Sequence, residues 1–336
     1  MALPLIRHSL KRKDLDQLLV SVLQDQQDSR SYYERLKHEL GESFATPQTA
    51  LYASASSAVI SLLRASGLIP GDRVLLSVLA PGYWAQGLLA AGIEIVWSDV
   101  ASTVPVLDIA ELAGSGSFEG IKAVVADTAL GYLPALELLH ENSFQVIVDF
   151  SQGLGGTVMQ KPVSNWGDWV LATFGSESLL AGPGGCVIGR RKPSSEQPLE
   201  PMVWDRLSEM VCALVLSQWS DVETLSEGKR ENFRVLFHRL SRRVSQPHQP
   251  GDAYPVLPVF PVVVDSGAKE VLWFARKHAV EADWAFRDHR WWPGLEASDA
   301  FPNARKFVQH TLAFPLYSSF GSKELELLGK VLASLP

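Results

Sequence analysis

The 336-residue chain has few of the features that mark secreted, membrane-spanning or nucleic-acid-binding proteins. Its two cysteines, Cys186 and Cys212, are too few for a disulfide framework and too far apart for a paired metal site. No stretch approaches the ~20 consecutive apolar residues of a membrane helix, and the first residues lack the pattern of an export signal. The net charge of -7 argues against nucleic acid, because phosphate binding needs a basic face. We therefore expect a cytoplasmic protein without membrane or nucleic-acid partners.

The composition is typical of a globular protein with a substantial core, at 46% hydrophobic and 20% charged residues. Apolar residues at helical spacing predict helices over 15–23 and 31–40, with Gly41 ending the second. From Thr49 to about residue 190, short apolar runs alternate with helical segments. This alternation predicts an α/β domain with a mostly parallel sheet covered on both faces. Within it we expect a helix over 134–142.

The pattern changes after Pro193. Residues 203–243 read as one long helical stretch, and the last eighty residues mix strand-like and helical segments, which suits a small α+β unit. We therefore expect a large α/β domain over residues 1–200, followed over 201–336 by a connecting helix and a small C-terminal domain.

Several short motifs occur in the order found in one known family. They lie at 68–74 (LIPGDRV), 81–83 (PGY), 91–99 (AGIEIVWSD), 148–155 (VDFSQGLG), 182–185 (GPGG) and 206–209 (RLSE). Together they cover nearly the whole chain, which resembles the DegT/DnrJ-type sugar aminotransferases. The resemblance implies the fold of the fold-type-I pyridoxal-phosphate transferases and a homodimer, because segment 206–209 lies near the subunit interface in that family.

The resemblance also implies a cofactor site. Asp149 matches the aspartate that pairs with the pyridine nitrogen, and Gln152 matches a second family position. Without the resemblance, Asp149 would be read as a strand-end residue that caps a turn. Tyr83 and Trp84 are available to stack on the cofactor ring, although core packing is the usual role of such aromatics.

The phosphate of this family lies at a helix N-terminus, which corresponds here to Ser56 and Ser57. Both serines could equally be plain N-cap residues. Thr173 replaces a serine near the phosphate. Two changes depart from the family: Ala55 replaces a glycine, and Trp204 replaces an asparagine that reaches the neighbouring subunit's phosphate.

The lysine that forms the Schiff base in the family is missing. Its position falls on Glu177 or Ser178, depending on which side the loop is aligned from, and no lysine occurs from 162 to 191. Neither a carboxylate nor a hydroxyl can supply the nucleophilic amine. Pyridoxal phosphate, if it binds at all, would then be held without a covalent bond.

Three hypotheses follow from the resemblance and these departures. The chain is a relative without transaminase activity, or a partner subunit of a genuine sugar aminotransferase in sugar or polysaccharide biosynthesis. Alternatively, it is an enzyme that acts on a sugar nucleotide with non-covalently bound pyridoxal or pyridoxamine phosphate. Glu177 would then be a candidate general base, although a solvated loop residue is an equally good interpretation. The first two hypotheses explain the number of departures better than the third.

Overall fold

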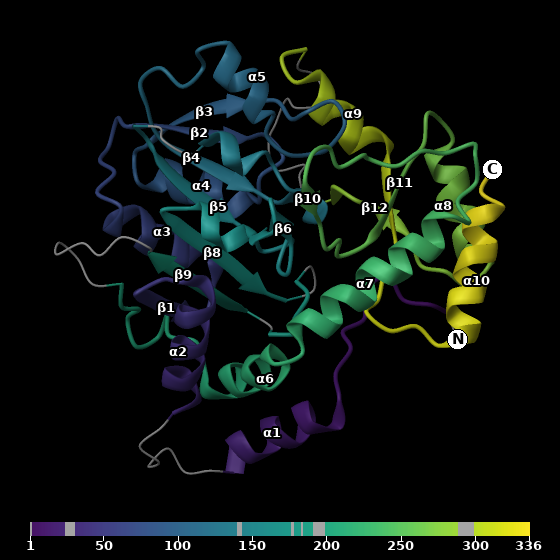
Figure 1. Ribbon diagram of the computed structural model, residues 1–336, viewed down its shortest axis with the longest axis horizontal. Helices are drawn as coiled ribbons and strands as arrows, with labels where there is room; N and C mark the ends of the chain where they lie inside the picture. The colour runs from purple at the N-terminus through teal and green to yellow at the C-terminus, as the bar shows by residue number, and fades with distance from the viewer. Residues whose placement is uncertain are drawn as a thin grey trace.

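The computed structural model describes residues 2–23, 31–139, 143–175, 178–182, 184–190, 199–287 and 299–336. A seven-stranded sheet forms its centre, with the strand order β1-β9-β8-β5-β4-β2-β3 (Figure 1). The strands are β1 (Gln48–Tyr52), β2 (Arg73–Ser77), β3 (Glu94–Ser98), β4 (Ile121–Asp127), β5 (Gln145–Asp149), β8 (Trp169–Phe174) and β9 (Gly185–Arg190). Neighbouring strands pair in parallel from β3 through to β8, whereas β9 is antiparallel to both β8 and β1. The predicted mostly parallel α/β fold is therefore confirmed.

Helices cover both faces of this sheet, as the apolar strands require. One face packs against α3 (Ala55–Ala65) and α4 (Gly82–Ala90). The other packs against α2 (Tyr32–Phe44) and α6 (Glu209–Trp219), with α1 (Arg12–Leu23) lying against α6. Alternate residues of one strand enter different cores: Leu75 of β2 belongs to the core on the α2 and α6 side, while Val74 and Leu76 belong to the core on the α3 and α4 side. This alternation fixes which strand-end side chains share a face.

Three sequence predictions about helices need correction. Helix α2 does not end at Gly41 but continues to Phe44, where Ala45 takes a left-handed conformation and closes the helix. A side chain at Gly41 would press on Thr49, so this glycine permits close packing instead of ending the helix. The helix expected over 134–142 is a single 3-10 turn, η2 (Leu136–Leu139), in the part described, and 140–142 lie outside the described residues.

The stretch expected to be one helix over 203–243 consists of α6 and α7 (Val222–Phe237), separated by a short turn. Helix α7 runs from the large sheet to the C-terminal region (Figure 1). That region holds a second sheet in the order β11-β13-β12. Its elements are β11 (Phe260–Val263), α8 (Ala268–Lys277), β12 (Asp283–Trp284), α9 (Pro302–His310), β13 (Thr311–Phe314) and α10 (Ser322–Ala333).

The remaining elements are short. They are α5 (Ile109–Gly114), η1 (Ala129–Gly131), η3 (Val163–Trp166) and a small sheet of β10 (Ala253–Tyr254), β6 (Thr157–Val158) and β7 (Lys161–Pro162). The N-terminal segment joins the C-terminal region, where Leu3 pairs with Val280 and packs into that core. None of the helices in the described ranges is long and apolar enough to cross a membrane.

Candidate functional site

Two carboxylates lie side by side where the central parallel strands end. Asp127 is the last residue of β4, Asp149 is the last residue of β5, and the two are partners in the sheet register. Both are about 1% exposed. Their position in the strand alternation places them on the face covered by α3 and α4, as it does Val125 and Ile147. Open α/β sheets bind their ligands at this end of the strands.

Asp149 accepts four hydrogen bonds from its own chain. The Tyr83 hydroxyl and the Trp84 indole N–H donate to Oδ2, at 2.6 Å and 2.7 Å. The Ser151 backbone N–H and hydroxyl donate to Oδ1, at 3.0 Å and 2.5 Å. Because a carboxylate offers about four lone-pair positions, these bonds fill the acceptor capacity of Asp149. Burial raises the pKa of Asp149, whereas the bonds from Ser151, Tyr83 and Trp84 lower it.

The structure places Tyr83 and Trp84 at the start of α4, with their polar atoms on Asp149. Trp84 is fully buried among α3, α4 and the sheet. Thr173, another predicted cofactor contact, donates its backbone N–H to the Ser151 hydroxyl at 3.0 Å. These predicted residues do meet around Asp149, but the contacts they make there are with one another.

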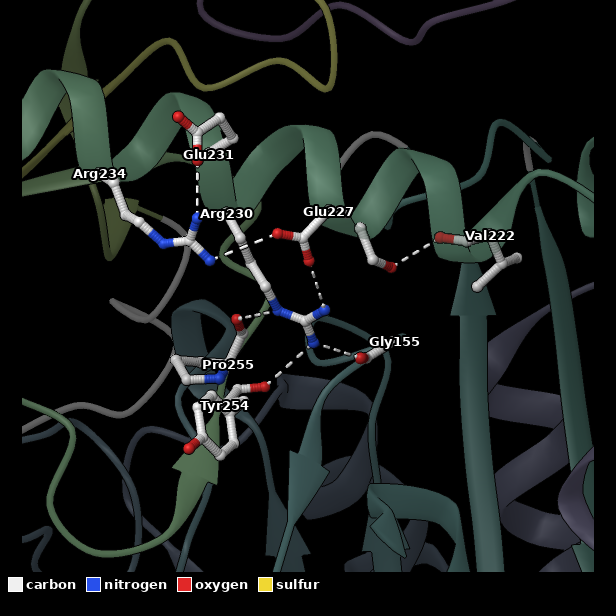
Figure 2. A network of polar contacts seen from close by, with 9 residues as sticks. Gly155, Val222, Glu227, Arg230, Glu231, Arg234, Tyr254 and Pro255 are labelled. Atoms are coloured by element: carbon white, nitrogen blue, oxygen red, sulfur yellow. Dashed lines mark hydrogen bonds and ion pairs between the residues drawn. The ribbon is translucent and has the colours of Figure 1, made fainter. Parts of the chain in front are cut away.

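Gln152 lies near the carboxylates, in the loop that follows β5. Its side-chain oxygen accepts a hydrogen bond from the Leu130 backbone N–H. The far end of this loop is tied to α7, because Arg230 donates to the Gly155 carbonyl at 2.7 Å (Figure 2). Glu227 lies 3.6 Å from the Arg230 guanidinium and also pairs with Arg234. The connecting helix therefore holds the loop that carries Gln152.

The N-terminus of α3, expected to hold a phosphate, is engaged by the chain itself. Ser54, and neither Ser56 nor Ser57, is the N-cap, and it accepts from the Ser57 backbone N–H at 3.3 Å. The Ser57 hydroxyl donates to an Asp205 carboxylate oxygen at 2.9 Å. Ser56 is exposed. A carboxylate thus already lies at the positive end of this helix.

Asp205 reaches this position because its segment pairs with the edge strand β1. The Ala53 N–H donates to the Asp205 carbonyl, and the Leu207 N–H donates to the Leu51 carbonyl, at 2.7 Å and 3.3 Å. The residues just before Asp205 are exposed and apolar: Met202, Val203 and Trp204. Trp204, which replaces the family's asparagine, is 78% exposed.

Glu177 and Ser178, the two candidates for the lysine position, differ in whether the structure describes them. Glu177 lies outside the described residues. Ser178 is buried and lines a second cavity, apart from the carboxylates, together with His8 and Lys229. The Lys229 ammonium donates to the carbonyls of Leu257, Pro258 and Leu316 at 2.7–3.2 Å. Ser178 therefore lines a cavity other than the one that contains Asp149.

Comparison with known proteins identifies the fold. No protein-family profile and no curated protein sequence matches the chain. Solved structures do match over almost the whole length. A Helicobacter pylori aminotransferase involved in the biosynthesis of pseudoaminic acid is 16% identical with a TM-score of 0.85, covering 99% of this chain and 98% of its own. This is the fold of the sugar aminotransferases.

Two further structures support that assignment. A DegT DnrJ EryC1 StrS aminotransferase from Brucella abortus is 13% identical, with a TM-score of 0.82 and coverage of 95% and 94%. The GDP-4-keto-6-deoxy-D-mannose-3-dehydratase of E. coli, solved with hydrated pyridoxal phosphate, is also 13% identical, with a TM-score of 0.84 and coverage of 99% and 100%. Identities this low establish the fold and leave the activity open.

The described residues do not fit pyridoxal phosphate as the resemblance would place it. The carboxylate that should bind the pyridine nitrogen is saturated by Tyr83, Trp84 and Ser151. A carboxylate of the same chain lies at the helix end that should bind phosphate. No lysine occurs between residues 162 and 191.

Sequence reasoning missed Asp127, Ser151, Asp205 and Lys229. Asp127 had a usable signal, because it ends an apolar strand just as Asp149 does. Asp205 and Lys229 had no such signal. The position of Asp205 depends on the pairing of residues 205–207 with β1. The role of Lys229 depends on three backbone carbonyls that are distant from it in sequence.

Proposed function

We propose that this protein has the fold of the sugar aminotransferases without their transaminase chemistry, and that it serves sugar metabolism as a binding protein or partner subunit. The observation that carries the proposal is the set of four internal hydrogen bonds to Asp149. A pyridine nitrogen could bind Asp149 only if Tyr83, Trp84 or Ser151 gave up a hydrogen bond to it. Trp84 is fully buried, so displacing its N–H would leave that donor unsatisfied, at a cost of about 1–3 kcal/mol.

The neighbouring structures support the sugar part of this proposal. The E. coli relative is named as a dehydratase of a GDP-linked keto sugar, and the H. pylori relative as an aminotransferase of pseudoaminic acid synthesis. A sugar nucleotide is therefore the ligand class that we propose for this protein. The alternative, an enzyme with non-covalently bound pyridoxal or pyridoxamine phosphate, would require the hydrogen bonds around Asp149 to rearrange.

The deciding experiment is an absorbance titration of the purified protein with pyridoxal phosphate, followed by borohydride reduction. We expect neither a reducible aldimine band nor a saturable spectral change. The variants Glu177→Lys and Ser178→Lys are the matched comparison, because each restores an amine at one candidate position. A borohydride-stable adduct in the unmodified protein would refute the proposal. Saturable but non-covalent binding would establish the alternative.

We also propose a homodimer in which the exposed surface of Met202, Val203 and Trp204 contacts a second copy. Val203 is 87% exposed, and three adjacent apolar side chains in water favour burial in an interface. Sedimentation equilibrium should give twice the chain mass of 36.9 kDa, and Trp204→Glu should shift the equilibrium to the monomer. Trp273→Glu is the control, because Trp273 is also exposed but lies on α8. A monomer at micromolar concentration would refute this proposal.

A further inference from the structure

Asp127, the last residue of β4, is a buried carboxyl group that is 1% exposed. Among the described residues, no group makes a hydrogen bond of standard geometry to either of its oxygens. The nearest donors are the backbone N–H groups of Asp127 itself and Ala129, and these lower its pKa. Its neighbour Asp149, equally buried, accepts four hydrogen bonds. Buried polar groups are nearly always paired, so an unpaired carboxylate at this end of the sheet requires an explanation.

The Asp127 side chain lines a small cavity. Polar walls come from Thr128, Asp149, Ser151 and Gln152, and apolar walls come from Leu79, Pro81 and Ala129. The cavity has a volume of about 10 Å³, which is room for one group the size of a water molecule. Asp149 is the one other ionisable residue in this lining, and it is also acidic. The cavity therefore attracts positive charge and contains no cation of its own.

We propose that this cavity binds the protonated amino group of an organic ligand, with the Asp127 carboxylate as its counter-ion. An ammonium group donates up to three hydrogen bonds, and the lining contains acceptors in Asp127, Ser151 and Gln152. The apolar side chains of Leu79, Pro81 and Ala129 would contact the carbon that carries the nitrogen. Within the described ranges, no three acidic, histidine or cysteine residues converge as a metal site would require. An organic amine suits this lining better than a divalent ion.

The proposal goes beyond the proposed function, because it names a chemical class of ligand and requires no cofactor. Amino sugars belong to this class. Burial, together with the negative charge of Asp149, raises the pKa of Asp127 to about 8. Below that pH, binding of an ammonium group should ionise Asp127 and release a proton to the buffer. Proton release is a signature that surface binding of the same cation would not give.

Thermal unfolding at about pH 8.5, without pyridoxal phosphate, tests the site with methylammonium chloride as the probe. An alkylammonium ion stays protonated there, as a lysine side chain does. Tetramethylammonium, potassium and sodium chlorides at equal ionic strength are the comparison salts, because none of them donates a hydrogen bond. We expect methylammonium to raise the Tm by about 1–2 °C more than the other salts at a saturating concentration.

In the Asp127→Asn variant, methylammonium should raise the Tm no more than the comparison salts do, while the effect that all four salts share should remain. Asp168→Asn is the matched control, because Asp168 accepts from the Val146 N–H at the opposite end of β5 and should leave the methylammonium response intact. Calorimetry at about pH 7 in two buffers of different ionisation enthalpy should show up to one proton released in the unmodified protein and none in Asp127→Asn.

Either of these results would overturn the assignment: a response to methylammonium no larger than the response to potassium, or an undiminished response to methylammonium in Asp127→Asn. Neither of them bears on the proposed loss of transaminase chemistry, since no cofactor is present. An aldimine band in the cofactor titration would in turn leave the amine site standing. The two proposals therefore fail separately.

Discussion

Two buried ionisable side chains, Lys229 in α7 and Asp127 at the end of β4, have opposite surroundings. The Lys229 ammonium donates to three backbone carbonyls from two separate segments, which use all three of its N–H groups. In the part of the chain that the structure describes, Asp127 has no comparable donors. Burial lowers the pKa of Lys229 to about 7 and, with Asp149, raises that of Asp127 to about 8. The bonded Lys229 ammonium joins α7 to two distant segments of the chain, whereas the Asp127 carboxyl group faces a cavity.

The largest effect should come from Lys229→Met, which keeps the length of the side chain and removes its three donors. Three carbonyls lose their partner at the junction of α7 with the C-terminal region. We expect the free energy of unfolding to fall by about 3–5 kcal/mol, measured by urea denaturation. Lys330→Met on α10 is the control, because Lys330 is exposed and its ion pair with Glu326 lies in solvent, where such pairs contribute little to stability. A loss below about 1 kcal/mol for Lys229→Met would show that the carbonyls find other partners.

The second effect compares the two carboxylates directly. Asp149→Asn replaces an acceptor of four hydrogen bonds with an amide whose NH₂ group faces at least one of the same donors. The free energy of unfolding should fall by about 2–4 kcal/mol at neutral pH. Asp127→Asn should be neutral or stabilising under the same conditions, because no hydrogen bond is lost. If both variants lost the same free energy of unfolding, the two carboxyl groups would contribute equally to stability, and the four hydrogen bonds to Asp149 would not set it apart from Asp127.

The third prediction concerns pH, and its sign follows from the raised pKa of Asp127. In the unfolded chain the pKa of this carboxyl group is near its ordinary value of 3.8, and in the folded protein its pKa is about 8. Between these values the folded state binds the extra proton, so stability falls as pH rises, by up to about 1.4 kcal/mol per pH unit. Asp127→Asn should remove this slope between about pH 5 and 8. An unchanged slope in urea denaturation would show that another group causes it.

Sequence predicted the strands and the layers because apolar runs and helical spacers report burial directly. Strand β5 and Asp149 at its end were foreseen in this way. The same reasoning failed at Gly41, where glycine serves close packing against Thr49 instead of helix termination. It also failed for the helix over 134–142, because the apolar residues at 136 and 139 suit a 3-10 turn equally well.

The site was only partly predictable. Tyr83, Trp84, Thr173 and Gln152, which the resemblance offers as cofactor contacts, lie around Asp149 in the structure, and their contact with a cofactor stays a prediction. Their partners could not be foreseen, because a hydrogen bond from Tyr83 to Asp149 depends on side-chain directions that the sequence does not encode locally. The contact at the start of α3 could not be foreseen either, because the position of Asp205 depends on the pairing of a distant segment with β1.

The smallest effect should come from the contact at the start of α3. The Ser57 hydroxyl and the Asp205 carboxylate are joined by one hydrogen bond at 2.9 Å, and a double-mutant cycle of Ser57→Ala and Asp205→Ala should give a coupling of about 0.5–1.5 kcal/mol. Asp205 also carries negative charge at the positive end of the helix, so its removal leaves that end free for another anion. Inorganic phosphate should therefore stabilise Asp205→Ala against urea more than it stabilises the unmodified protein. Ser54→Ala is the control, because it removes the N-cap but keeps the Asp205 carboxylate in place. If phosphate stabilises all three proteins equally, the Asp205 carboxylate does not keep phosphate from this helix.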